Sequence, residues 1–93
     1  MRGLELKVKI TAKAQKDLKN VPEHVQEKVR DWTQSVEIFG MSETRRIPGW
    51  HDEPLKRKRK GQRSIRLNRS YRAIYEESTS ELVEIVEVTN HKY

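Results

Sequence analysis

Apolar residues in the first forty positions follow two different periods. Near the start of the chain they occupy every second position, as Leu4, Leu6, Val8 and Ile10. Farther along they recur every three or four positions, as Val21, Val25, Val29, Trp32 and Val36. The first period is that of a half-buried β-strand, and the second places apolar side chains on one face of a helix. The pattern predicts a strand over 4–10 followed by a helical region.

Local capping signals divide this helical region into two helices. Thr11 can accept a hydrogen bond at the start of a short helix, and Pro22 suits the first turn of a second one. Gly40 lies just past the expected end of the second helix. We expect Ile38 and Phe39, which lie next to that end, to extend the packing of the helix against the core.

The second half of the chain contains three β-like runs, at 62–68, 71–77 and 82–88. Turn-like residues at 68–70 and 78–80 join them, and such short joints predict an antiparallel meander. The whole order is β-α-α-β-β-β, an α+β fold in which two N-terminal helices pack on one face of an antiparallel-rich sheet. The first strand can join a sheet edge or pair with the last strand, and periodicity does not decide between these positions.

Residues 40–61 show neither period and carry glycines and prolines, so we expect a long irregular connection. Long loops in compact domains are uncommon and often functional. No Gly-, Ser- or Pro-rich linker divides the sequence, and its length suits one domain over 1–93.

The charge of the chain is concentrated in one segment. The formal net charge is +6 over 93 residues, but residues 45–72 alone carry eleven basic and two acidic side chains, a net charge of +9. The basic residues are Arg45, Arg46, Lys56, Arg57, Lys58, Arg59, Lys60, Arg63, Arg66, Arg69 and Arg72. Residues 76–87 are the opposite extreme, with five glutamates and no basic residue. A basic balance of this size indicates a polyanionic partner such as a nucleic acid or an anionic membrane surface.

Composition also excludes several classes of protein. The chain has no cysteine, which excludes disulfides, a thiolate zinc site and a cysteine nucleophile. Its three histidines lack the spacing of metal ligands, so we expect no metal and no cofactor. The N-terminus lacks the apolar stretch of a signal peptide, and no apolar run approaches the roughly 20 residues of a membrane span. We therefore expect a cytoplasmic protein that does not bind a membrane.

Three motifs in the second half resemble those of RelE/ParE-superfamily toxins. They are Gly-Gln-Arg-Ser-Ile-Arg-Leu at 61–67, Tyr-Arg-Ala-Ile-Tyr at 71–75 and the terminal Asn-His-Lys-Tyr at 90–93. The Pro-Leu-Lys run at 54–56, preceded by His51, is similar to the HigB branch, and the final His-x-Tyr is similar to the ending of YoeB toxins. The resemblance covers about residues 50–93 by motif and the whole chain by size and element order.

This resemblance implies a toxin of a bacterial type II toxin–antitoxin pair. Most RelE and HigB toxins are endoribonucleases that cleave mRNA in the ribosomal A site, whereas ParE toxins share the fold but poison DNA gyrase. A third possibility is a non-catalytic basic nucleic-acid-binding module on the same fold. The resemblance also implies a cognate antitoxin as partner, together with the ribosome and mRNA. A partner that covers the basic segment is expected to bring acidic side chains.

Metal-free RNA cleavage needs groups that move protons and stabilise charge on the scissile phosphate. Arg72 matches the arginine of the family's Tyr-Arg motif, and Arg66 matches a basic strand position that is Lys in RelE. His91 and Tyr93 match the catalytic C-terminus, and Lys56 matches the HigB branch. The resemblance therefore implies these five as catalytic residues.

Six further positions are candidate contacts to RNA or the ribosome, because basic side chains bind phosphates without reading sequence. These candidates are His51, Arg57, Lys58, Arg59, Lys60 and Arg63. Two positions depart from the family pattern. Ser64 stands where RelE has a second lysine, and Arg57 stands where HigB-like chains often have glycine.

Overall fold

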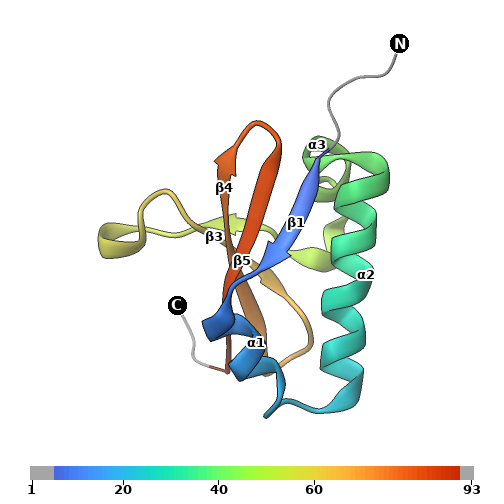
Figure 1. Cartoon of the computed structure of the whole chain (residues 1–93), viewed down its shortest axis with the longest axis vertical. Helices are drawn as coiled ribbons and strands as arrows, with labels where there is room; N and C mark the ends of the chain where they lie inside the picture. Colours follow the sequence, from blue (N-terminus) through green and yellow to red (C-terminus); the bar gives the residue numbers. More distant parts are fainter. Residues whose placement is uncertain (1–5, 91–93) are drawn as a thin grey trace.

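The computed structural model describes residues 6–90, and five strands in this range form one sheet in the order β1-β5-β4-β3-β2 (Figure 1). The strands are β1 (Lys7–Ile10), β2 (Glu53–Pro54), β3 (Arg63–Arg66), β4 (Arg72–Thr79) and β5 (Leu82–Thr89). The helices are α1 (Ala12–Leu18), α2 (Glu23–Phe39) and α3 (Met41–Arg45), with two 3₁₀ turns, η1 (Pro48–Trp50) and η2 (Arg57–Arg59). No helix within 6–90 is both long and apolar enough to cross a lipid bilayer. The predicted α+β class with an antiparallel-rich sheet is confirmed.

The position of β1 resolves the alternatives that periodicity left open. It occupies one edge of the sheet and pairs in parallel with β5, with Val8 opposite Val83 and Ile10 opposite Ile85. The other neighbouring strands run antiparallel. The predicted joint at 78–80 is wrong by two residues, because β4 continues to Thr79 and pairs there with Leu82.

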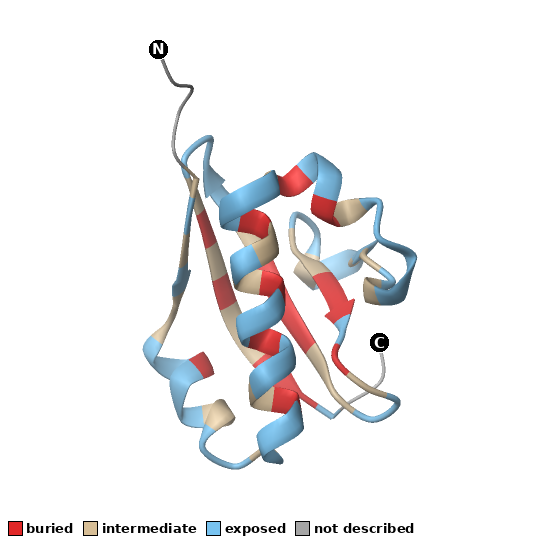
Figure 2. Cartoon of the chain, turned by 90° about the vertical axis from the view of Figure 1, so that its right-hand side faces the viewer, coloured by how far each residue is buried: buried red, intermediate tan, exposed pale blue. Residues whose placement is uncertain are grey.

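The core lies between α2 and one face of the sheet. The predicted apolar stripe is buried from Val25 to Val36, and Figure 2 shows buried positions recurring along α2. Val21, where the predicted stripe began, precedes α2 and is half-buried. The Trp32 ring packs 4.7 Å, centroid to centroid, from the Tyr75 ring. The expectation for Ile38 and Phe39 is wrong, since their exposed fractions are 71% and 65%. Both lie past Val36, the last buried residue of α2, and Gly40 then turns the chain with a φ of +89°.

The connection over 40–61 contains more structure than its sequence pattern predicted. It holds α3, both 3₁₀ turns and β2, which pairs with β3 at the sheet edge far from β1. In Figure 1 the segment that contains η2 projects from the side of the sheet opposite α2. This connection therefore adds an edge strand to the sheet and a loop that projects from the side of the sheet opposite α2.

A buried carboxylate fastens this connection to the sheet. The Asp52 side chain is 1% exposed, and its oxygens accept hydrogen bonds from Arg63 Nε at 2.5 Å and from the Tyr75 hydroxyl at 2.5 Å. Arg45 Nε lies 3.8 Å from Asp52 Oδ2. Burial raises the pKa of Tyr75 above its ordinary value, and the hydrogen bond to Asp52 raises that pKa further, so the phenol remains a donor. Asp52 thus links residue 45 and the strands β3 and β4.

We predict that Asp52→Asn destabilises the fold, because it leaves two arginines facing a neutral side chain. Breaking a buried ion pair costs roughly 3–5 kcal/mol. Arg45 and Arg63 keep exposed fractions of 33% and 26%, so solvent screens part of the loss. We expect the free energy of unfolding in urea to fall by about 2 kcal/mol. Asp31→Asn, which removes the same charge from the exposed surface of α2, is the control, and equal urea midpoints for both variants would contradict this role of Asp52.

Candidate functional site

A groove of about 1130 Å³ lies between the 53–59 segment and the β3–β4 hairpin. Seven basic side chains line it, whereas Glu53 is the one acidic side chain among the described residues that do so. The basic side chains are Lys56, Arg57, Lys58, Arg59, Arg66, Arg69 and Arg72. The groove therefore gathers much of the charge of the basic segment around a single concave surface, as a site for an anion requires.

Two arginines face each other across the strands that form one wall of this groove. Arg66 of β3 and Arg72 of β4 are direct cross-strand partners, so their side chains leave the same face of the sheet. That face is opposite the core, because Ile65 and Leu67 point into the core cluster. Like charges directly opposite each other destabilise a sheet. An anion bound between the two guanidinium groups would remove this repulsion.

Arg72 is held by neutral acceptors. Its Nη2 and Nε groups donate to Ser64 Oγ at 2.8 and 3.2 Å, and Nη2 also donates to the His51 carbonyl oxygen at 3.4 Å. Within residues 6–90, no glutamate of the acidic 76–87 segment forms an ion pair with it. The positive charge of Arg72 is thus oriented without being neutralised.

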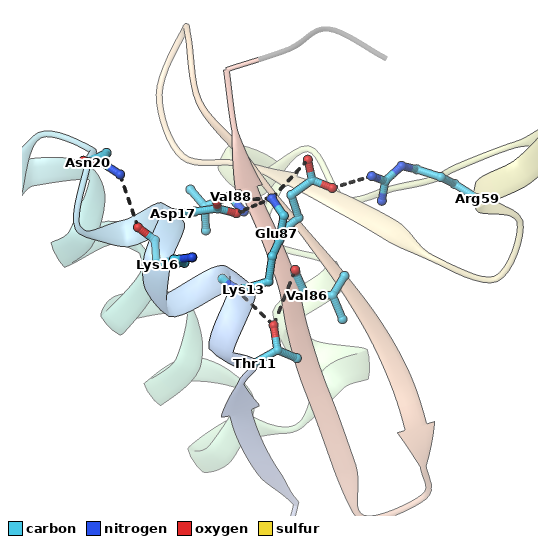
Figure 3. Close-up of polar contacts among 10 residues, drawn as sticks. Thr11, Lys13, Lys16, Asp17, Asn20, Arg59, Val86, Glu87 and Val88 are labelled. Atoms are coloured by element: carbon cyan, nitrogen blue, oxygen red, sulfur yellow. Dashed lines mark hydrogen bonds and ion pairs between the residues drawn. The ribbon is translucent and has the colours of Figure 1, made fainter.

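Two other predicted RNA-binding residues have carboxylate partners. Arg59 forms an ion pair with Glu87 of β5 (Figure 3). It also donates to Gln62 Oε1 at 2.8 Å. Arg63 is bound to Asp52. These ion pairs attach the basic segment to the sheet, which the sequence did not indicate. Contact of the two arginines with RNA stays a prediction.

The remaining side chains of the basic run are exposed, namely Lys56, Arg57, Lys58 and Lys60. Arg57 has a φ of +60°, the left-handed conformation that glycine adopts at little cost. A residue with a Cβ atom pays about 1 kcal/mol there. The turn therefore keeps the backbone shape that a glycine would favour, although the sequence supplies an arginine.

His51 contributes to the site through its backbone. Its φ is +46°, its side chain is exposed, and its carbonyl oxygen faces Arg72. The ring is not among the described residues that line the groove. The structure thus supports a positioning role for this residue and gives no support to the predicted contact between its ring and RNA.

Glu53 is a functional candidate that the sequence reading missed. It lies in β2 directly opposite Ser64, so it shares the sheet face of Ser64, Arg66 and Arg72. A carboxylate in this position can accept a proton from a hydroxyl group bound in the groove. The sequence offered one signal for Glu53: it immediately precedes the Pro-Leu-Lys run at 54–56, which is similar to the HigB branch.

The predicted C-terminal pair, His91 and Tyr93, lies outside the described residues. Asn90, the last described residue, lines the groove together with Arg66 and Arg72. Within residues 6–90 no group of three or more His, Asp or Glu side chains is arranged to hold a metal ion.

No family model and no curated protein matches the sequence, but solved structures match nearly the whole chain. A chain of the E. coli DinJ-YafQ toxin–antitoxin complex is 18% identical with a TM-score of 0.73, and the match covers 95% of this chain and 94% of that one. The RelBE2 toxin–antitoxin complex of Mycobacterium tuberculosis gives 23% identity, a TM-score of 0.67 and coverages of 95% and 100%. The YoeB/ParE toxin of Agrobacterium tumefaciens is 20% identical with a TM-score of 0.68, and the match covers 94% of this chain and 100% of that one. The chain therefore has the fold of the RelE-superfamily toxins, as the resemblance of its motifs implied.

Proposed function

We propose that the protein is the toxin of a bacterial type II toxin–antitoxin pair and that it is a ribosome-dependent mRNA endonuclease. The observation that carries this proposal is the pair formed by Arg66 and Arg72, which face each other across two strands inside a basic groove. The shared fold with solved toxins supports the same class of protein. A cognate antitoxin is part of the proposal, since two of those matches are toxin–antitoxin complexes.

The proposed reaction is attack of a ribose 2′-oxygen on the adjacent phosphorus atom. The P–O5′ bond breaks, and the products are a 2′,3′-cyclic phosphate and a 5′-hydroxyl group. The enzyme must accept the 2′-hydroxyl proton, stabilise the extra negative charge on the phosphate oxygens and supply a proton to the leaving 5′-oxygen. The three tasks call for a general base, a positive charge and a general acid.

The groove contains groups for the first two tasks. Glu53 is the proposed base, because it is the one carboxylate among the described residues that line the groove. Arg72 and Arg66 supply positive charge to the phosphate, and Lys56 adds to it from the opposite wall. For the third task we propose His91 or Tyr93, the residues that the family resemblance implies.

We predict that Arg72→Ala reduces mRNA cleavage by about 100-fold, because the phosphate loses an oriented guanidinium group in the transition state. Primer extension on a translated mRNA, with and without ribosomes, measures the new 5′ ends. Arg69→Ala is the matched control, since Arg69 lines the same groove but lies in the hairpin turn. Equal cleavage by the two variants would exclude the proposed role of Arg72.

The same assay on the wild-type protein tests the proposed activity. New 5′ ends without ribosomes would overturn the ribosome dependence, and growth arrest without new 5′ ends would favour gyrase inhibition.

A second prediction concerns the base. Glu53→Gln keeps the shape of the side chain but cannot accept the proton, so the single-turnover rate constant should fall by about 100-fold. Affinity for RNA should be unchanged or higher, because the variant removes a negative charge from the groove. Glu27→Gln on the exposed surface of α2 controls for the change in net charge. A wild-type rate constant in Glu53→Gln would mean that another group takes the proton.

A third prediction concerns the exposed lysines of the basic run. Replacement of Lys56, Lys58 and Lys60 by Gln should weaken RNA binding and flatten its salt dependence. Each lost phosphate contact to a single strand lowers the slope of log K against log salt by about 0.7, so we expect a decrease of up to about 2. The control is the triple variant Lys7→Gln, Lys9→Gln and Lys19→Gln, which removes equal charge from exposed positions outside the groove. Identical slopes for the two triple variants would show that binding does not use this run.

A further inference from the structure

Ser64 is a buried polar residue. It lies in β3 between Glu53 of β2 and Ile74 of β4, and its exposed fraction is 1%. A buried hydroxyl group destabilises a protein unless it forms hydrogen bonds. Among the described residues, Ser64 Oγ accepts two hydrogen bonds, both from Arg72. The position of Ser64 is therefore explained by the guanidinium group above it.

These hydrogen bonds determine which side of Arg72 is available to a ligand. A guanidinium group has five N–H bonds in one plane. The Nε group and Nη2 donate to Ser64 Oγ, and Nη2 also donates to the His51 carbonyl oxygen. Nη1 has no acceptor among residues 6–90. The contacts thus engage the Nε–Nη2 side of the fork and leave the Nη1 side to a molecule in the groove.

The repulsion between Arg66 and Arg72 makes this anchoring necessary. The two residues are direct cross-strand partners, and each long side chain can lower the repulsion by rotating away from the other. The contact with the His51 carbonyl oxygen is long, at 3.4 Å, and weak on its own. Ser64 supplies the shorter contact at 2.8 Å and holds the guanidinium group against the repulsion. Because its hydroxyl group is neutral, it does so without cancelling the charge that binds phosphate.

We propose that Ser64 is a positioning residue, which aligns the Arg72 guanidinium group so that Nη1 faces the phosphate in the groove. This inference rests on the proposed RNA cleavage for its catalytic consequence, but the alignment itself is a property of the free protein. The role also accounts for a small polar residue at a position where RelE has lysine. A lysine there would add a third positive charge, whereas serine orients the arginine already present.

The alignment can be measured in the free protein by ¹⁵N relaxation of the Arg72 Nε–H group. We expect Ser64→Ala to lower the order parameter of this group from a rigid value to below about 0.6. Ser70→Ala is the matched control, because Ser70 lines the same groove. Ser70 forms its hydrogen bond to Asn68 through the backbone N–H, which the substitution leaves in place. Ser64→Cys keeps the side-chain volume and accepts hydrogen bonds weakly, so it should give an intermediate order parameter. An Arg72 Nε–H group as rigid in Ser64→Ala as in Ser70→Ala would overturn the proposal.

The catalytic consequence is tested by a double-mutant cycle on single-turnover cleavage. Ser64→Ala should lower the rate constant by about tenfold or more with little change in the Kd for RNA, because the number of charges is unchanged. In an Arg72→Ala background the same substitution should have no further effect. Additive losses would contradict an action through Arg72. If the wild-type protein cleaves no RNA, the proposed function fails, and the relaxation measurement still decides whether Ser64 aligns Arg72.

Discussion

The geometry of the groove depends on the hydrogen bonds that the buried carboxylate of Asp52 accepts. This carboxylate binds Arg63 and Tyr75, which lie in two adjacent strands, and it is almost completely removed from solvent. The residues on either side of it both serve the groove. His51 offers its carbonyl oxygen to Arg72, and Glu53 places its carboxylate on the groove face of β2. An irregular stretch of chain can thus position an acceptor and a candidate base precisely, because a buried anchor lies between them.

The basic segment is divided into two groups by its partners. Arg45, Arg59 and Arg63 each contact a carboxylate, and these contacts attach the segment to the sheet. Arg66 and Arg72 have no carboxylate partner among residues 6–90, and both line the groove. A net charge of +9 is therefore a poor measure of the charge that a ligand meets. What matters is which cations are left unneutralised, and that depends on glutamates and an aspartate that are distant in sequence.

The regular elements could be predicted from the sequence because each has its own period or cap. The stripe from Val25 to Val36 specified α2, and Thr11 accepts the predicted capping hydrogen bond from Ala14 at 3.2 Å. The edge position of β1 could not be predicted, since alternation marks a half-buried strand without naming its neighbour. The structure of the 40–61 connection was equally hidden, because long-range contacts to Asp52 stabilise it in place of a local pattern.

A motif in the sequence could select candidate site residues, but it could not show how those residues pair in the fold. Arg66 and Arg72 were identified from the resemblance, and the register of β3 and β4 brings them together. Arg59 and Arg63 could not be distinguished from free cations, because their partners are 28 and 11 residues away. Glu53 was one carboxylate among fourteen acidic residues until the sheet placed it opposite Ser64.

The paired arginines are the feature of the groove that most favours an anionic ligand. Natural sequences tend to be locally consistent, and departures from that consistency concentrate at functional sites. Two like charges held opposite each other lower the stability of the free protein, and Ser64 prevents one of them from relieving the repulsion by rotation. The same charges become favourable when a phosphate lies between them. The arrangement therefore trades stability of the free protein for affinity toward an anion, and in a phosphoryl-transfer site the gain is largest when negative charge on the phosphate is greatest.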